Sequence, residues 1–178
     1  MTPTPNILAL LEKLRKNSHL GKHKHFSAAD RCRHYNTYLG IPVVIINVLL
    51  GSLLFANLSE QIPTPMKWLG AFLALTAAVL SGLQTFLNFQ KAFEAHRRVA
   101  NQYLSIARDC ERLIVLFQDN LIQLSDLAKK VEEVNEKYNK VNAEAEAFPT
   151  NNSDLQKATR IERAKVEELK SGQIRHNP

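Results

Sequence analysis

Residues 39–58 read LGIPVVIINVLLGSLLFANL and residues 68–89 read WLGAFLALTAAVLSGLQTFLNF, two stretches without a charged side chain. Twenty helical residues span about 30 Å, which matches the hydrocarbon core of a bilayer. A cleavable signal sequence begins nearer the N-terminus and has a shorter apolar region. The two stretches therefore predict two transmembrane helices of an all-α integral membrane protein.

The linker between the stretches, residues 59–67, is short enough to make them a helical hairpin. Seven Lys and Arg residues precede the first stretch within residues 1–37, the linker carries only Lys67, and residues 90–178 carry fifteen. The positive-inside rule then places both termini in the cytosol and the linker outside. Cys32 and Cys110 both fall on the reducing cytosolic side, and two cysteines are too few for a disulfide scaffold.

The overall composition resembles that of a soluble protein, with 178 residues, a formal charge of +6 and a mean hydropathy of −0.22. The basic excess lies in residues 1–37, which hold seven basic and two acidic residues, whereas residues 90–178 hold fifteen and fourteen. A basic segment beside a span suits the topology and anionic lipid. The bilayer, and not a nucleic acid, is therefore the expected charged partner.

Three regions follow from these patterns: N-terminal cytosolic amphipathic and juxtamembrane helices over 1–37, the hairpin over 38–90, and a cytosolic helical region over 91–178. Within the first region, Thr4-Pro5 predicts the start of a short helix that ends near Gly21. The capping-box spacing of Ser27 to Asp30 predicts a second start, of a helix that runs on into the membrane.

Apolar residues recur every 3.5 positions on average between Val99 and Val141, which is the coiled-coil period. We therefore expect the second membrane helix to continue as one long cytosolic helix over about 91–147. A turn at Pro149 and a capping box of Ser153 with Gln156 predict a final helix over about 154–171. The apolar stripe fits the core of a bundle with the helices over 28–38 and 154–171, or a contact between subunits of a homo-oligomer, and both can hold together.

No catalytic motif occurs in the sequence: it has no P-loop, dinucleotide turn, G-x-S-x-G or H-E-x-x-H. His19, His23, His25 and His34 precede the first span, but no cysteine or carboxylate completes a metal-ligand set with them. A solvated, basic segment facing the lipid surface is the simpler interpretation. We expect no enzyme activity, no cofactor and no metal.

The membrane helices carry small and polar residues at helical spacing. A small-residue stripe on the second helix would let another helix approach closely; it comprises Gly70, Ala74, Ala78 and Gly82. Amides and hydroxyls in the spans need a partner, either across helices or in a water-filled pore, and both interpretations stay open. These polar candidates are Asn47, Ser52, Ser81, Gln84, Thr85 and Asn88.

Neither span contains a charged residue, so a voltage sensor, a proton relay or a charged filter inside the bilayer is not expected. Selectivity would then arise from uncharged dipoles, a hydrophobic constriction or charges at the pore mouths. The candidate mouth charges are Glu60 and Lys67 outside, and Lys91, Glu94 and Arg97 inside.

The layout resembles the SLATT family, a group of bacterial two-helix membrane proteins. The resemblance rests on the polar helix over 30–38 before the first span, Trp68 at the second membrane entry, the exit segment over 89–103, and a proline break at Pro149 before a last charged helix. It implies a pore-forming effector of a prokaryotic conflict system, in the inner membrane. It also implies a separate nucleotide-sensing or nucleotide-producing partner as the trigger.

From the sequence we expect a homo-oligomeric, ion-conducting membrane protein gated through its cytosolic helices. A membrane-anchored scaffold that recruits cytosolic partners through its long helix is the alternative of another class. A holin-like lesion former also fits two spans with a basic flank, but a lesion needs no long ordered helix.

Overall fold

The computed structural model describes residues 5–57 and 63–175 of the chain, and the side chains of residues 6–55 and 63–168. These residues form five helices: α1 (Pro5–Asn57), α2 (Thr64–Leu87), α3 (Phe89–Gln118), α4 (Leu124–Glu146) and α5 (Asn152–Arg175). The expected all-α fold is confirmed. The helices make two compact units, a hairpin unit over residues 30–93 and a bundle unit of residues 1–29 with 94–178.

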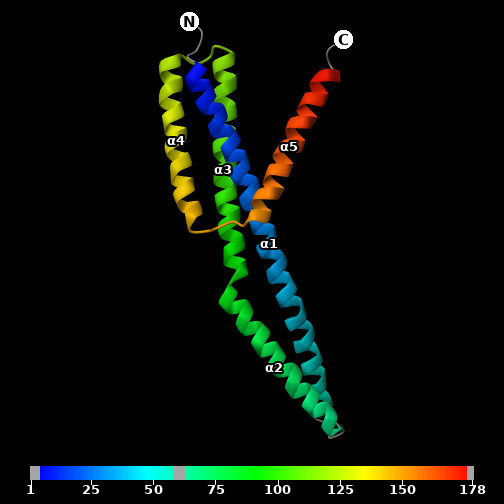
Figure 1. Cartoon of the computed structure of the whole chain (residues 1–178). Coiled ribbons are helices and arrows are strands. Elements are labelled where there is room, and N and C mark those ends of the chain that lie inside the picture. Colours follow the sequence, from blue (N-terminus) through cyan, green and yellow to red (C-terminus); the bar gives the residue numbers. More distant parts are fainter. Residues whose placement is uncertain (1–4, 58–62, 176–178) are drawn as a thin grey trace. The chain divides into compact units, whose positions relative to one another are not determined.

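The hairpin unit consists of α1 from Asp30 onward, the whole of α2 and the start of α3 up to Phe93. Its two long helices, α1 and α2, run antiparallel (Figure 1). α1 passes through Pro42 without ending. One face of α2 lies against α1 at seven-residue intervals. A Cβ built on Gly70 would lie 3.7 Å from Leu53, Ala77 is buried, and the Gln84 amide donates to Asn36 Oδ1 at 3.4 Å. A seven-residue repeat keeps one face of a helix on its neighbour.

Asn88 separates α2 from α3. Its backbone adopts the left-handed conformation, with φ 42° and ψ 47°, which asparagine tolerates better than most residues. Its N–H donates to the Gln84 carbonyl at 3.1 Å, and its side-chain oxygen accepts from the Lys91 N–H at 3.3 Å. One residue therefore ends the second membrane helix and caps the helix that follows.

The bundle unit is built from the first half of α1 with α3, α4 and α5. The N-terminal part of α1 lies beside α3, and α4 returns antiparallel to α3 (Figure 1). Its buried core is drawn from these three helices and comprises Leu11, Leu14, Val99, Tyr103, Ile106, Cys110, Leu113, Ile114, Leu127, Val131, Val134 and Val141. The apolar stripe seen in the sequence is therefore largely buried within the chain, apart from Leu121 and Leu124 at the turn between α3 and α4. The segment that covers it is residues 5–29, and not the predicted 28–38 helix.

Two expected helix ends are wrong. The predicted stop near Gly21 and restart at Ser27 do not occur, because α1 is one helix of 53 residues. Gly21 instead permits a close contact. A Cβ on it would lie 3.0 Å from Cδ2 and Cε2 of Tyr103, so glycine is needed for α1 to reach α3. The boundary between the two units accordingly falls after Ala29, and not at residue 37.

The predicted single helix over 91–147 is also wrong, because the chain turns back between Gln118 and Leu124. Asn120 takes a positive φ of 55°, and the Leu121 N–H donates to the Leu116 carbonyl at 2.9 Å, which closes the end of α3. The apolar spacing continues through this turn because α3 and α4 bury their stripes in one core.

α5 contains the predicted final helix, but its capping box lies two residues earlier than expected. Asn151 Oδ1 accepts from the Asp154 N–H at 2.9 Å, and Asp154 Oδ2 accepts from the Asn151 N–H at 3.0 Å. Ser153 donates its hydroxyl to Asn151 Oδ1 at 2.9 Å and is not itself the cap.

We predict that Asn151→Ala lowers the stability of α5 by about 1 kcal/mol, the usual cost of a lost N-cap. Amide exchange of α5 peptides should accelerate about fivefold. Gln156→Ala, at the partner position of the box expected from the sequence, should change exchange little. Equal effects of the two substitutions would contradict the assignment of the cap.

Candidate functional site: the outer face of the membrane hairpin

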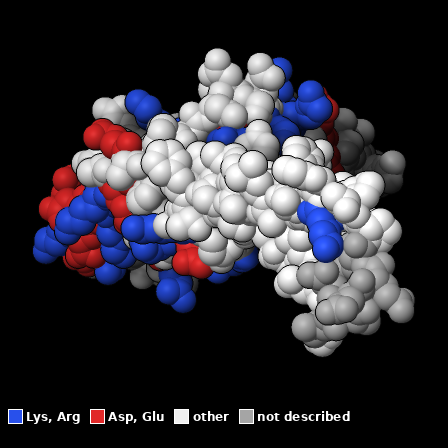
Figure 2. Space-filling model, turned by 90° about the horizontal axis from the view of Figure 1, so that it is seen from below, with Lys and Arg blue, Asp and Glu red and all other residues white. Residues whose placement is uncertain are grey.

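The hairpin unit exposes large apolar side chains along both of its helices. Within the most apolar window of each long helix, only 6% of the residues are buried. The exposed side chains include Ile41, Val44, Ile45 and Val48 on α1, and Trp68, Phe72, Leu75, Val79 and Phe86 on α2. Figure 2 shows a broad, largely uncharged surface on this face of the molecule. An apolar surface of this extent requires lipid or protein around it.

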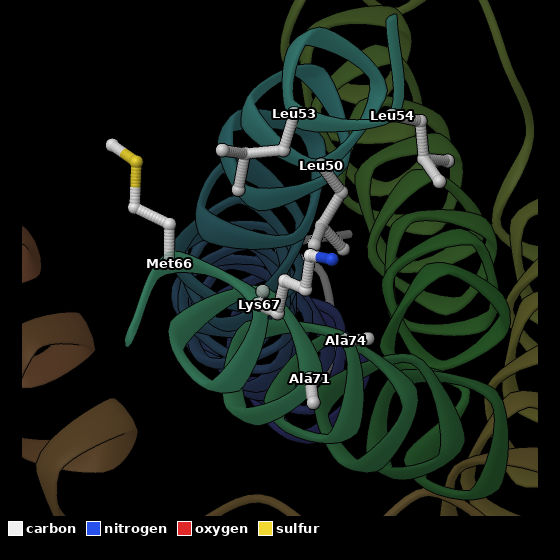
Figure 3. Close-up of a pocket in the computed structure, with 8 residues that line it drawn as sticks. Leu50, Leu53, Leu54, Met66, Lys67, Ala71 and Ala74 are labelled. Atoms are coloured by element: carbon white, nitrogen blue, oxygen red, sulfur yellow. The ribbon is translucent and has the colours of Figure 1, made fainter. Parts of the chain in front are cut away.

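An apolar groove of about 400 Å³ lies between α1 and α2 at the end of the hairpin near the linker (Figure 3). Leu50, Leu53 and Leu54 of α1 line one side, and Met66, Gly70, Ala71 and Ala74 of α2 line the other, together with Lys67. The ammonium of Lys67 is the one charge among these lining residues. The hairpin alone therefore does not fill the space between its two helices at this end.

Only part of the small-residue stripe lies against α1. Gly70 lies against α1, whereas Ala74, Ala78 and Gly82 are exposed. A Cβ built on Gly82 would meet nothing within 4 Å. Every fourth residue advances around a helix by about 40°, so the stripe leaves the α1 contact after Gly70. Three of its four positions remain open to another helix.

The polar candidate residues of the spans differ in the hydrogen-bond partners of their side chains. The hydroxyls of Ser52 and Thr85 donate to the backbone carbonyls of Val48 and Ser81, each at 3.0 Å, which allows either side chain to face lipid. Gln84 bonds inside the hairpin, and it also lies against Gly40, whose Cβ would be 3.3 Å from the Gln84 amide nitrogen.

Asn47 differs from these residues in its hydrogen bonding. Its side chain is exposed on α1 and makes no hydrogen bond within the described part of the chain. An amide in the hydrocarbon region needs a partner, because an unsatisfied polar group there costs several kcal/mol. The partner must come from outside the described residues, and water or another protein chain can supply it.

Of the mouth charges expected from the sequence, Glu60 lies outside the described residues. Lys67 and Lys91 are exposed in the hairpin unit, and Glu94 and Arg97 are exposed in the bundle unit. Glu94 and Arg97 each take part in a polar or charged interaction.

The histidines before the first span do not form the solvated segment that the sequence suggested, except for His34, which is exposed. His19 Nε2 lies 2.9 Å from Glu111 Oε1 of α3, and His23 Nε2 lies 3.1 Å from Glu162 Oε1 of α5. His25 is only 2% exposed. These residues lie on the sides of α1 that face α3 and α5, which the sequence spacing alone did not show. Among the described residues, no group of three or more His, Cys, Asp or Glu side chains is placed to hold a metal.

Burial also favours the neutral forms of Tyr103 and Cys110 in the bundle core. It raises the pKa of Tyr103 to about 12 and that of the Cys110 thiol to about 11. The Tyr103 hydroxyl donates to Asn142 Oδ1 of α4 at 2.6 Å, so α3 and α4 are joined by a hydrogen bond as well as by packing.

Two long apolar helices with lipid-compatible surfaces, joined to a polar helical bundle, define a helical membrane protein with two spans. The model of the SMODS and SLOG-associating 2TM effector domain family 4 (SLATT_4) matches residues 17–171. The chain belongs to this family, and the resemblance noted in the sequence is confirmed. No curated protein and no solved structure matches the chain.

Proposed function

We propose that the protein is a non-enzymatic effector that assembles with copies of itself into an ion-conducting pore. The observation that carries the proposal is the outer face of the hairpin, where Asn47 lacks a hydrogen-bond partner within the described chain and Ala74, Ala78 and Gly82 lie uncovered. Two helices cannot enclose a pore, so conduction requires several subunits. Small residues allow the close helix contact that assembly needs, and an amide facing a water-filled lumen is satisfied by water.

The bundle unit supports a gated pore more than a simple lesion. Its apolar core is formed within one chain, and charged pairs between helices add to it, including Arg98 to Glu144 at 2.8 Å and Lys137 to Asp109 at 3.2 Å. An ordered bundle provides a folded surface that a triggering molecule can bind. We place it in the cytosol of a prokaryotic cell, because the basic residues lie on that side of the spans.

Membership of the family supports the biological setting that we propose. The SMODS and SLOG association in the family's name points to a separate nucleotide-signalling protein as the trigger. The pore then acts as the effector arm of a prokaryotic conflict system.

The test is ion flux from liposomes that contain the purified full chain, with potassium, calcium and chloride reporters in parallel. Asn47→Leu should change flux at least tenfold, because it removes the one exposed amide described within residues 39–55 of α1. Val48→Leu, on the neighbouring exposed position, is the matched control and should leave flux unchanged. Ala78→Leu should reduce both flux and the chemical cross-linking of subunits, because its side chain blocks close helix approach.

Absence of flux from oligomeric, correctly inserted protein, even after addition of cytosolic extract and nucleotides, would overturn the pore and favour a membrane-anchored scaffold. Flux that Asn47→Leu and Val48→Leu alter equally would show that Asn47 does not line the conducting path.

A further inference from the structure

A buried pair of imidazoles joins α1 to α3 in the bundle unit. His25 is 2% exposed and His96 is 5% exposed, and their Nδ1 atoms lie 3.1 Å apart. Aromatic rings enclose the pair, with Tyr103 centred 5.8 Å from His25 and Phe148 centred 6.2 Å from His96. Water therefore has little access to this contact.

The geometry of the contact limits how many protons it holds. A hydrogen bond between two Nδ1 atoms requires one nitrogen that carries hydrogen and one that does not. Two neutral rings of opposite tautomer satisfy this condition, and so does one neutral ring with one imidazolium. Two imidazolium rings do not, because both Nδ1 atoms then carry hydrogen and both rings carry positive charge.

The groups around the pair come from three helices. Lys24 of α1 and His96 of α3 disfavour a charge on His25, whereas Asp154 of α5 favours it. Tyr103 of α3 remains neutral because burial raises its pKa to about 12. Burial has the largest effect, and together these groups lower the pKa of His25 to about 4.

We propose that His25 and His96 form a proton-operated latch, which holds residues 5–29 of α1 on α3 at neutral pH and releases them when the solution around the bundle unit becomes acidic. α1 is one helix from Pro5 to Asn57, so the released segment is continuous with the first membrane helix. The latch is a regulatory device of the bundle itself and can be measured without any ion flux.

The direction of the pH effect on the docked state follows from the lowered pKa of His25. The docked state favours the neutral ring, so it loses stability as the pH falls below the free value of 6.5, and the loss is complete near the docked value of about 4. Between pH 7.5 and pH 5.0, one histidine with these two pKa values shifts the opening equilibrium about 25-fold.

Two other histidines of α1 lie against carboxylates of neighbouring helices. His19 lies 2.9 Å from Glu111, and His23 lies 3.1 Å from Glu162. Glu111 is 44% exposed, however, and water weakens an ion pair at such a position. Burial lowers the pKa of His23, so protonation of this ring also destabilises the docked state as the pH falls. Release should therefore dominate the response.

The experiment is hydrogen–deuterium exchange of the full chain in lipid nanodiscs at pH 7.5 and pH 5.0, corrected for the intrinsic pH dependence of exchange. Peptides within residues 11–29 should lose protection about 25-fold at pH 5.0 in the wild type. His25→Asn places an amide where Nδ1 lies and does not titrate, so most of this loss should vanish. His34→Asn removes an exposed histidine of the same helix and should respond as the wild type does.

Unchanged protection of the wild type between the two pH values would overturn the latch, as would a His25→Asn variant that still loses protection 25-fold. Should His25→Asn lose protection already at pH 7.5, histidine NMR of the wild type decides the question. A His25 titration midpoint near 4 supports the latch, and a midpoint near 6.5 overturns it. Because neither measurement requires conduction, failure of the latch is distinguishable from failure of the proposed pore.

Discussion

Gly21→Leu is expected to separate α1 from α3 and to lower the stability of the bundle unit by about 3 kcal/mol. A Cβ at this position already falls 3.0 Å from two ring carbons of Tyr103, and leucine adds three more carbons beyond it. The ring has no room to move, because it is buried and its hydroxyl is bonded to Asn142 on α4. The gain of about 1 kcal/mol in helix propensity when a glycine is replaced is too small to offset this overlap.

Amide exchange of peptides from residues 11–29 measures the effect, which should be an acceleration of about 100-fold at neutral pH. Ala9→Leu introduces the same side chain at an exposed position of the same helix and should leave exchange nearly unchanged. Gly21→Leu with wild-type protection would show that α1 is not packed on α3 at this point.

The spans were predictable because a charge-free run is visible in the order of residues along the chain. No neighbouring element is needed to recognise that residues 39–58 and 68–89 cannot remain in water. The family resemblance rested on the same feature, the order of polar and apolar segments along the chain, and the family match over residues 17–171 confirms it.

The helix ends of the bundle were not predictable in this way. Gly21 is a helix-stop signal when taken locally, and only the position of Tyr103 on another helix explains why α1 continues through it. The turn at Asn120 was not predictable because no change in the apolar spacing marks it. Its flanking helices share one core, so the apolar spacing does not change where the chain reverses.

The candidate site was predictable as a set of residues but not in its orientation. Spacing placed Gly70 and Ala78 on one stripe, yet the structure turns Gly70 toward α1 and leaves Ala78 exposed. Sequence also grouped Asn47 with Gln84, and only the hairpin shows that Gln84 bonds to Asn36 while Asn47 does not bond within the described chain. The His25–His96 contact was missed entirely, because a pair 71 residues apart has no local signal.

Leu127→Ala is expected to destabilise the bundle unit by about 3–4 kcal/mol, whereas Leu121→Ala, only six residues earlier, should cost less than about 0.5 kcal/mol. Leu127 of α4 is fully buried in the core of the bundle unit, while Leu121 is 71% exposed in the turn after α3. Truncating a buried leucine loses its transfer free energy and leaves a cavity, whereas truncating an exposed one does neither.

The pair of substitutions also distinguishes the two roles of the apolar stripe. Amide exchange of α4 peptides should accelerate more than 100-fold in Leu127→Ala and remain nearly unchanged in Leu121→Ala, if the stripe serves only its own chain. A comparable loss of protection in Leu121→Ala, together with weaker cross-linking between subunits, would contradict that result. It would mean that a neighbouring subunit covers the turn, so that the stripe extends from the core of one chain into the contact between two.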